Sequence, residues 1–289
     1  SSEFTRLPDR FYDQEDDGDA INFSGAIAEL SDQRLVFSGS AHDTDTEYHV
    51  FSMMLEASGI QDMTYADQGI FLSEMEAESE IVNLTAGSQG QHLIQEHYNR
   101  FSMLDANGQY DTLFGDNASL DVSDSLEVVS TLALTSGGYL LAGADTTYGF
   151  VTKYTAAGTL DTDFGNNGQV NFTNADIAID SEIVLEAVEQ SDGKIIVVAL
   201  GVGLVRLNAN GSVDLGFSHV PGPVSNFSGL SVQDDGKILY IADGRYLNRL
   251  NADGNFDSDF NQNQSFDVTA IGSRFHSNSR TLTAQLPGG

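Results

Sequence analysis

The chain repeats one short pattern along its whole length: an aspartate followed three residues later by an aromatic residue. The copies begin at Asp9, Asp62, Asp111, Asp161, Asp214 and Asp257. Successive copies are about 50 residues apart. Self-similarity at a period of about 20 to 50 residues is typical of proteins that build one supersecondary unit again and again. This repeat therefore constrains the fold more strongly than any other feature.

Each repeat also contains a regular set of predicted strands. A short segment of alternating polar and apolar residues follows each marker, which indicates a strand; these segments are 20–23, 69–72, 119–122, 169–172, 224–227 and 265–268. Two apolar runs joined by a tight polar turn come next, and a further apolar run leads to the next marker. Turns such as Asp192-Gly193 supply the positive φ angles that β-hairpins need. The sequence therefore predicts an all-β fold.

The two ends of the chain together complete the last repeat. The final hairpin lacks its own third strand, but Glu3–Leu7 resembles Leu247–Leu250 and precedes the first marker. Sharing one blade between both termini closes a ring and hides strand edges. We therefore expect a single six-bladed β-propeller closed by N-terminal strands. It spans 1–285, with outer strands of the last blade from 1–23, inner strands from 266–285, and 286–289 as a linker or tail.

Three motifs carry a resemblance to a known family. They are D-G-K-I-[IL] at 192–196 and 235–239, R-L-N-A-[ND]-G at 206–211 and 249–254, and L-D-T-D-F-G-N-N-G at 160–168. This pattern resembles the delta-60 repeat family of bacterial β-propellers, with a degenerate match in the first two repeats. The resemblance implies a secreted, cell-surface or periplasmic domain, part of a larger bacterial protein, and brings no catalytic motif to this chain.

The charge of the chain limits its partners. Acidic residues number 43 against 12 basic ones, giving a formal net charge of -31. Such a charge repels phosphate backbones, which argues against nucleic acid and favours a cationic partner. The apolar runs are too short to cross a membrane. Cysteine is absent, which excludes disulfides and cysteine nucleophiles.

The markers themselves have a structural interpretation. Each aromatic residue is expected to pack as a wedge between neighbouring blades, and each aspartate to cap its own turn. The segments 105–111 and 251–257 resemble the start of a calcium loop, but neither has the glutamate that an EF-hand carries at its twelfth position. We interpret both segments as tight turns.

Glutamates occupy one equivalent position in three consecutive repeats, where the innermost strand begins: Glu80, Glu127 and Glu182. Residues at that position would ring one mouth of a central channel. Carboxylates that close together repel one another unless a cation compensates, and hard oxygen ligands suit calcium. These three residues are our candidate metal ligands, against the simpler interpretation that they start strands and point into solvent.

Two functions remain open from the sequence. The favoured one is a noncatalytic, monomeric binding or scaffold domain for a polysaccharide, a cell surface or a protein. Its candidate ligand site is His42, Asp43 and Asp45, in an insertion that interrupts the repeat, because loops often carry function. A solvated loop is the plainer interpretation. The alternative function is a hydrolase or lactonase-like enzyme with a cation in the central channel.

Overall fold

The structure is a computed structural model that describes residues 25–30, 32–42, 48–77, 83–97, 99–123, 125–145, 147–172, 184–199, 203–218, 227–243, 245–262 and 265–268. Within them the chain is all-β, with one short 3-10 turn, η2 (Ser88–Gly90). It divides into two compact units, each described by itself below. No helix among these residues could span a membrane.

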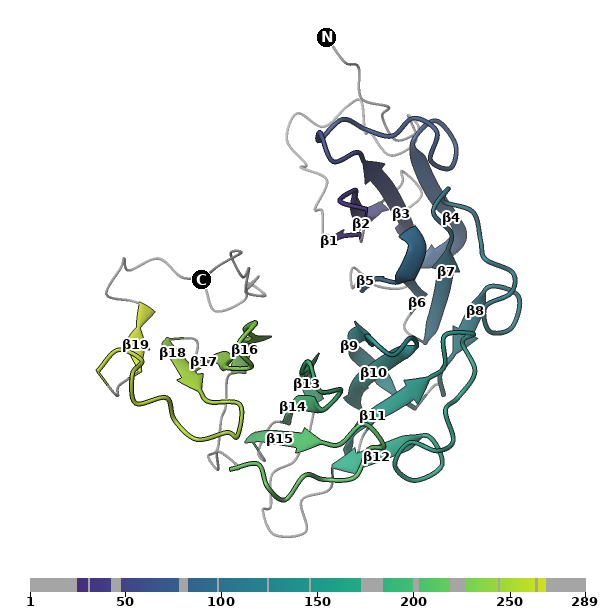
Figure 1. The fold of residues 1–289 in the computed structure, drawn as a ribbon. Helices are drawn as coiled ribbons and strands as arrows, with labels where there is room; N and C mark the ends of the chain where they lie inside the picture. The colour runs from purple at the N-terminus through teal and green to yellow at the C-terminus, as the bar shows by residue number, and fades with distance from the viewer. Residues whose placement is uncertain are drawn as a thin grey trace. The chain divides into compact units, whose positions relative to one another are not determined.

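Unit 1 contains two four-stranded antiparallel sheets, drawn in purple to teal in Figure 1. The first has the order β1-β2-β3-β4, with β1 Gly25–Glu29, β2 Leu35–His42, β3 Tyr48–Leu55 and β4 Ile70–Ala77. The second has the order β5-β6-β7-β8, with β5 Leu84–Ala86, β6 His92–His97, β7 Arg100–Leu104 and β8 Ser119–Asp121. Strand β1 contacts β5, and β4 contacts β6, so the two sheets are neighbours.

The boundary between the units falls in the segment that follows. Strand β9 (Glu127–Ala133) belongs to unit 1. Nearly all of β10 (Tyr139–Ala144) and β11 (Gly149–Tyr154), and the whole of β12 (Gln169–Phe172), belong to unit 2. Strands β11 and β12 pair antiparallel, from Gly149 opposite Phe172 to Thr152 opposite Gln169.

The remaining strands of unit 2 form one three-stranded and one four-stranded sheet among the described residues. The three-stranded sheet contains β13 Val184–Glu189, β14 Ile195–Ala199 and β15 Gly203–Leu207. The four-stranded sheet contains β16 Phe227–Val232, β17 Ile238–Ala242, β18 Tyr246–Leu250 and β19 Phe266–Asp267. Strands β13 and β16 are in contact, so these sheets are also neighbours.

These sheets confirm a propeller-like, all-β fold of repeated antiparallel units, and most strands lie where the repeat predicts them. Three details differ. Strand β2 continues to His42 because its pairing with β3 extends to Tyr48. Strand β4 continues to Ala77 for the same reason. Phe227 begins β16 rather than ending an outer strand at 224–227, and 224–226 lie outside the described residues.

The strands that would complete and close the ring are not among the described residues. The N-terminal segment 1–23 and most of 266–285 fall outside them. The described residues thus support repeated four-stranded units, while the blade count of six and the closure stay predictions.

The marker turns join neighbouring sheets in the predicted manner. The aromatic residues Tyr65, Phe114, Phe164 and Phe217 are buried, and Phe260 is partly buried. The backbone N–H that follows each of the first four donates to a carbonyl in the next repeat; the acceptors are Asn107, Ala157, Asn210 and Asp253, at 2.6 to 2.8 Å. The wedge interpretation is therefore confirmed for these four, and each wedge is held by a backbone hydrogen bond.

Glycines permit this close contact. A Cβ placed on Gly108 would lie 2.7 Å from the Tyr65 ring, and one on Gly211 would lie 2.6 Å from the Gly165 nitrogen. Both glycines also have positive φ angles, near 80°, which side chains other than glycine adopt at a cost. The absence of a side chain at Gly108 and Gly211 therefore lets the marker segment of the preceding repeat, with Tyr65 or Phe164, pack directly against the backbone of these turns.

Candidate functional site

Only part of the predicted ligand site can be located. His42 is the last residue of β2 and pairs with Tyr48, so it lies at the end of a strand rather than within a loop. Asp43 and Asp45 lie outside the described residues. The prediction that these three residues bind a ligand remains untested.

The predicted calcium ligands also lie only partly within the described residues. Glu127 is the first residue of β9, as expected for a residue that opens an innermost strand, and its side chain is exposed. Glu80 and Glu182 lie outside the described residues. Within the described part of the chain, no group of three or more His, Asp or Glu side chains is placed to hold a metal ion.

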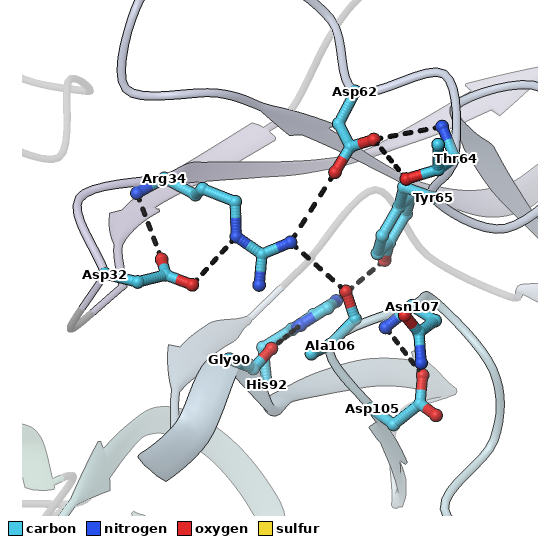
Figure 2. A network of polar contacts seen from close by, with 10 residues as sticks. All are labelled: Asp32, Arg34, Asp62, Thr64, Tyr65, Gly90, His92, Asp105, Ala106 and Asn107. Carbon is cyan, nitrogen blue, oxygen red and sulfur yellow. Dashed lines mark hydrogen bonds and ion pairs between the residues drawn. The ribbon is translucent and has the colours of Figure 1, made fainter.

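A buried polar cluster in unit 1 joins its two sheets (Figure 2). The Tyr65 hydroxyl lies 2.9 Å from His92 Nε2. It also lies 2.9 Å from Ser52 Oγ. Ser52 Oγ is also 3.3 Å from the same imidazole nitrogen. All three side chains are fully buried. The other ring nitrogen, Nδ1, lies 3.4 Å from the Gly90 carbonyl, so it carries the proton and Nε2 accepts.

Burial determines the charge state of this cluster. It lowers the pKa of His92 to about 4, because the interior disfavours the imidazolium form. It also raises the pKa of Tyr65. At neutral pH both groups are therefore uncharged. A serine, a tyrosine and a histidine could in principle perform acid–base chemistry, but here no substrate atom can reach them. We interpret the cluster as a packing element.

Arg34 forms a second arm of the same network. Its guanidinium bonds Asp32 at 2.9 Å, lies 3.6 Å from Asp62, and donates to the Ala106 carbonyl at 3.3 Å. Asp62 accepts the N–H of Thr64, as predicted for a marker aspartate that caps its turn. The hydrogen bond from the Thr64 hydroxyl lowers the pKa of Asp62, as does Arg34. Arg34 thus connects the first sheet to the turn that follows β7 in the second sheet.

A buried carboxylate lies elsewhere between these sheets. Glu96 accepts hydrogen bonds from the Ser73 hydroxyl at 2.7 Å, the Tyr110 hydroxyl at 2.6 Å and the Ser102 hydroxyl. Burial is the main cause that raises the pKa of Tyr110, and Glu96 adds to it. Three donors satisfy this carboxylate. It therefore serves, like the histidine cluster, to hold the two sheets together.

Sequence reasoning missed a cation that recurs at three of the markers, Asp161, Asp214 and Asp257. Arg206 bonds Asp214 at 2.9 Å, donates to the Ala252 carbonyl of the next repeat, and stacks 4.7 Å from the Phe217 ring centre. Lys194 also lies 3.0 Å from Asp214. The hydrogen bond from Lys194, the Gly216 N–H and Arg206 lower the pKa of Asp214 to about 2. The missed signal was a basic residue eight positions before the marker aspartate, as in Lys153, Arg206 and Arg249.

A concave feature lies on unit 2, beside the outer strand β12. A hollow of about 520 Å³ is lined by four amide side chains, those of Asn166, Asn167, Gln169 and Asn171. A second hollow of about 390 Å³ shares three of them and continues to Asn210 and Ser212. Asn166, Asn167 and Asn171 are exposed, and Gln169 donates to Asn171 at 2.6 Å. We call this joint feature the amide hollow.

The lining of the amide hollow contrasts with the rest of the chain. In a chain with 43 acidic residues, Asp163 is the one acid that lines either hollow. Each amide offers both donors and acceptors without charge. The equivalent positions after the marker Asp111 carry Asp116 and Asp121 in place of Asn166 and Asn171. The hollow is therefore suited to a neutral ligand rich in hydrogen-bonding groups.

Comparisons with known proteins support the fold. A family model described as "Domain of unknown function (DUF5122) beta-propeller" matches residues 190–217 and 233–260. This match supports a bacterial β-propeller repeat, without singling out the delta-60 repeat. A comparison with curated proteins found no match.

Several solved structures are similar at low identity. A protein of unknown function from Bacteroides caccae is 12% identical, with a TM-score of 0.47 over 79% of this chain and 70% of its own. A calcium-binding protein, regucalcin, from Agrobacterium tumefaciens is 15% identical, with a TM-score of 0.45 over 76% and 72%. BamB from Moraxella catarrhalis is 12% identical, with a TM-score of 0.38 over 81% and 84%. Similarity at this level supports no statement about ligand or activity.

Proposed function

We propose that this protein is a noncatalytic binding domain of a secreted or cell-surface bacterial protein, and that its ligand is a polysaccharide bound at the amide hollow. The amide hollow is the observation that carries the proposal. Polysaccharides present many neutral hydroxyl groups, which both donate and accept hydrogen bonds, as amides do. The buried His92 and Tyr65 are out of reach of any such ligand, which favours binding over catalysis.

The scaffold that we propose for this function is a six-bladed propeller over 1–285, closed by strands from 1–23 and monomeric. A closed ring leaves few strand edges exposed. Such a scaffold would hold the hollow rigidly, because each wedge and its backbone hydrogen bond join one sheet to the next.

The test changes the amides without changing their shape. Asn166→Asp and Asn171→Asp replace each amide NH₂ donor with a carboxylate oxygen and add charge. We expect the doubly substituted chain to lose at least about tenfold in affinity for a neutral polysaccharide that the unmodified chain binds, since each lost hydrogen bond to a ligand is worth about 1 kcal/mol. Binding is screened on a panel of neutral glycans and quantified by calorimetry.

A matched control makes the same chemical change elsewhere. The control is Asn107→Asp, in a turn of unit 1. The equivalent position before the marker Asp257 is already an aspartate, Asp253, so the change should be tolerated. The control should bind like the unmodified chain. Equal loss in both variants, or no binding of any neutral glycan by the unmodified chain, would count against the amide hollow as the ligand site.

The alternative, a hydrolase or lactonase-like enzyme with calcium held by Glu80, Glu127 and Glu182, is tested separately. Exposure of Glu127 at the start of β9 is the observation that keeps it open. Calcium is titrated into chelator-treated protein by calorimetry. Binding that weakens in the Glu127→Gln variant supports the site, whereas absent binding, or binding unchanged by that substitution, removes it.

A further inference from the structure

Asp163, the one acidic residue that lines the amide hollow, has no described cation as a partner. It is exposed, and its backbone N–H donates to the Asp161 carboxylate at 3.3 Å. Among the described residues, the carboxylate of Asp163 accepts no hydrogen bond and forms no ion pair. The cations of this marker and the next are already paired: Lys153 lies 2.9 Å from Asp161, and Arg206 lies 2.9 Å from Asp214. The Asp163 carboxylate therefore remains available to a ligand.

Hydrogen bonds within the hollow orient two of its amides. The N–H and the hydroxyl of Ser212 both donate to Asn210 Oδ1, at 3.0 and 2.8 Å. The Gln169 side chain donates to Asn171 Oδ1 at 2.6 Å. The NH₂ groups of Asn210 and Asn171 are therefore left to donate to a ligand oxygen, such as that of a sugar hydroxyl. An ammonium group only donates hydrogen bonds, so its charged acceptor in this hollow is Asp163.

One repeat alone combines this carboxylate with the amides. Two residues after the marker, other repeats carry Leu113 or Gly216 in place of Asp163. The last marker is followed by an aspartate at this position, Asp259, which is also exposed. Ten residues after that marker, however, the chain has Asp267 where the hollow has an amide. Asp259 therefore repeats the carboxylate without the amides around it, which makes it a natural control.

We propose that the ligand of the amide hollow is an amino polysaccharide, a polymer of hexosamine units with free amino groups, and that Asp163 binds one of its ammonium groups. This inference rests on the proposed function. The amides bond the hydroxyl groups of the same sugars, which are neutral. The net charge of -31 attracts a polycation from a distance and disfavours polysaccharides that carry uronate or sulfate groups. That attraction belongs to the whole chain, whereas the contact at Asp163 belongs to one residue, so the two can be separated.

Two hexasaccharides with the same backbone test the preference for an amine. Both are β-1,4-linked; the glucosamine hexamer carries an ammonium group at C2 of each sugar, and cellohexaose carries a hydroxyl there. Each Kd is measured by calorimetry at low ionic strength, at a pH at which the sugar amines are protonated. The unmodified chain should bind the glucosamine hexamer at least about threefold more tightly, as an exposed ion pair allows. Raising the ionic strength to about 0.5 M should reduce this preference, because salt screens exposed charges.

A pair of variants locates the preference. Asp163→Asn removes the charge and keeps the shape of the side chain, so it should lower the preference for the glucosamine hexamer by about threefold to fivefold. Asp259→Asn makes the same change of charge at the same turn position outside the hollow, so it should leave the preference unchanged. Because another repeat carries Leu113 at this position, both variants should fold, which circular dichroism checks.

The outcomes separate this inference from the proposed function. Equal Kd values for the two hexamers, or equal effects of Asp163→Asn and Asp259→Asn, would overturn the amine site at Asp163, while binding of a neutral glycan would still support the amide hollow. A neutral glycan that binds when the glucosamine hexamer does not would overturn it in the same way. Absence of binding by every glycan, neutral or amino, would overturn both proposals.

Discussion

The close approach of a wedge to the next repeat predicts a large and specific cost for Gly211→Ala. Gly211 has a φ of 83°, and its added Cβ would lie 2.6 Å from the Gly165 nitrogen and 3.1 Å from the Phe164 ring. The left-handed conformation alone costs about 1 to 2 kcal/mol for alanine. Displacing a packed neighbour adds about 1 to 3 kcal/mol. We therefore expect the free energy of unfolding to fall by about 2 to 5 kcal/mol.

Gly193→Ala is the matched control. Gly193 has a similar φ of 79°, but its added Cβ would meet only Ala209, at 3.9 Å. It should therefore cost only the conformational part, about 1 to 2 kcal/mol. Urea unfolding of both variants, followed by circular dichroism, gives the two values. Equal destabilisation would show that the contact with Gly165 and Phe164 contributes nothing, and the packing argument would be wrong.

Two further predictions concern the sheet interfaces. Burial lowers the pKa of His92 from its ordinary 6.5 to about 4. As the pH falls from 6.5 towards 4, only the unfolded state therefore takes up this proton. The neutral histidine's contribution to the free energy of unfolding, about 3 kcal/mol, is present above pH 6.5 and is lost across that window. The pH dependence of urea unfolding should therefore flatten in His92→Gln, and an unchanged slope would refute the assignment. Phe164→Ala should cost about 3 to 5 kcal/mol, while Phe256→Ala, at a ring that is 58% exposed, should stay within about 0.5 kcal/mol; comparable losses in both would contradict the wedge.

The sequence predicted the features that the repeat itself enforces. Turn chemistry and alternation located most strands, and a shared position identified the buried Phe164 and its relatives as wedges. The ends of β2 and β4 could not be predicted, since pairing with β3 extends both beyond the alternating residues. The network around His92 was also missed, because it joins side chains from two repeats whose residues at those positions differ from the consensus.

The candidate site was predicted poorly for a related reason. Sequence reasoning looked for charged or metal-binding groups, and so selected Glu127 and His42. The amide hollow instead depends on neutral residues, of which Asn166 and Asn167 lie within the repeat motif at 160–168 and Gln169 and Asn171 follow it. Only comparison among repeats reveals the signal: Asn166 and Asn171 replace the acids at Asp116 and Asp121.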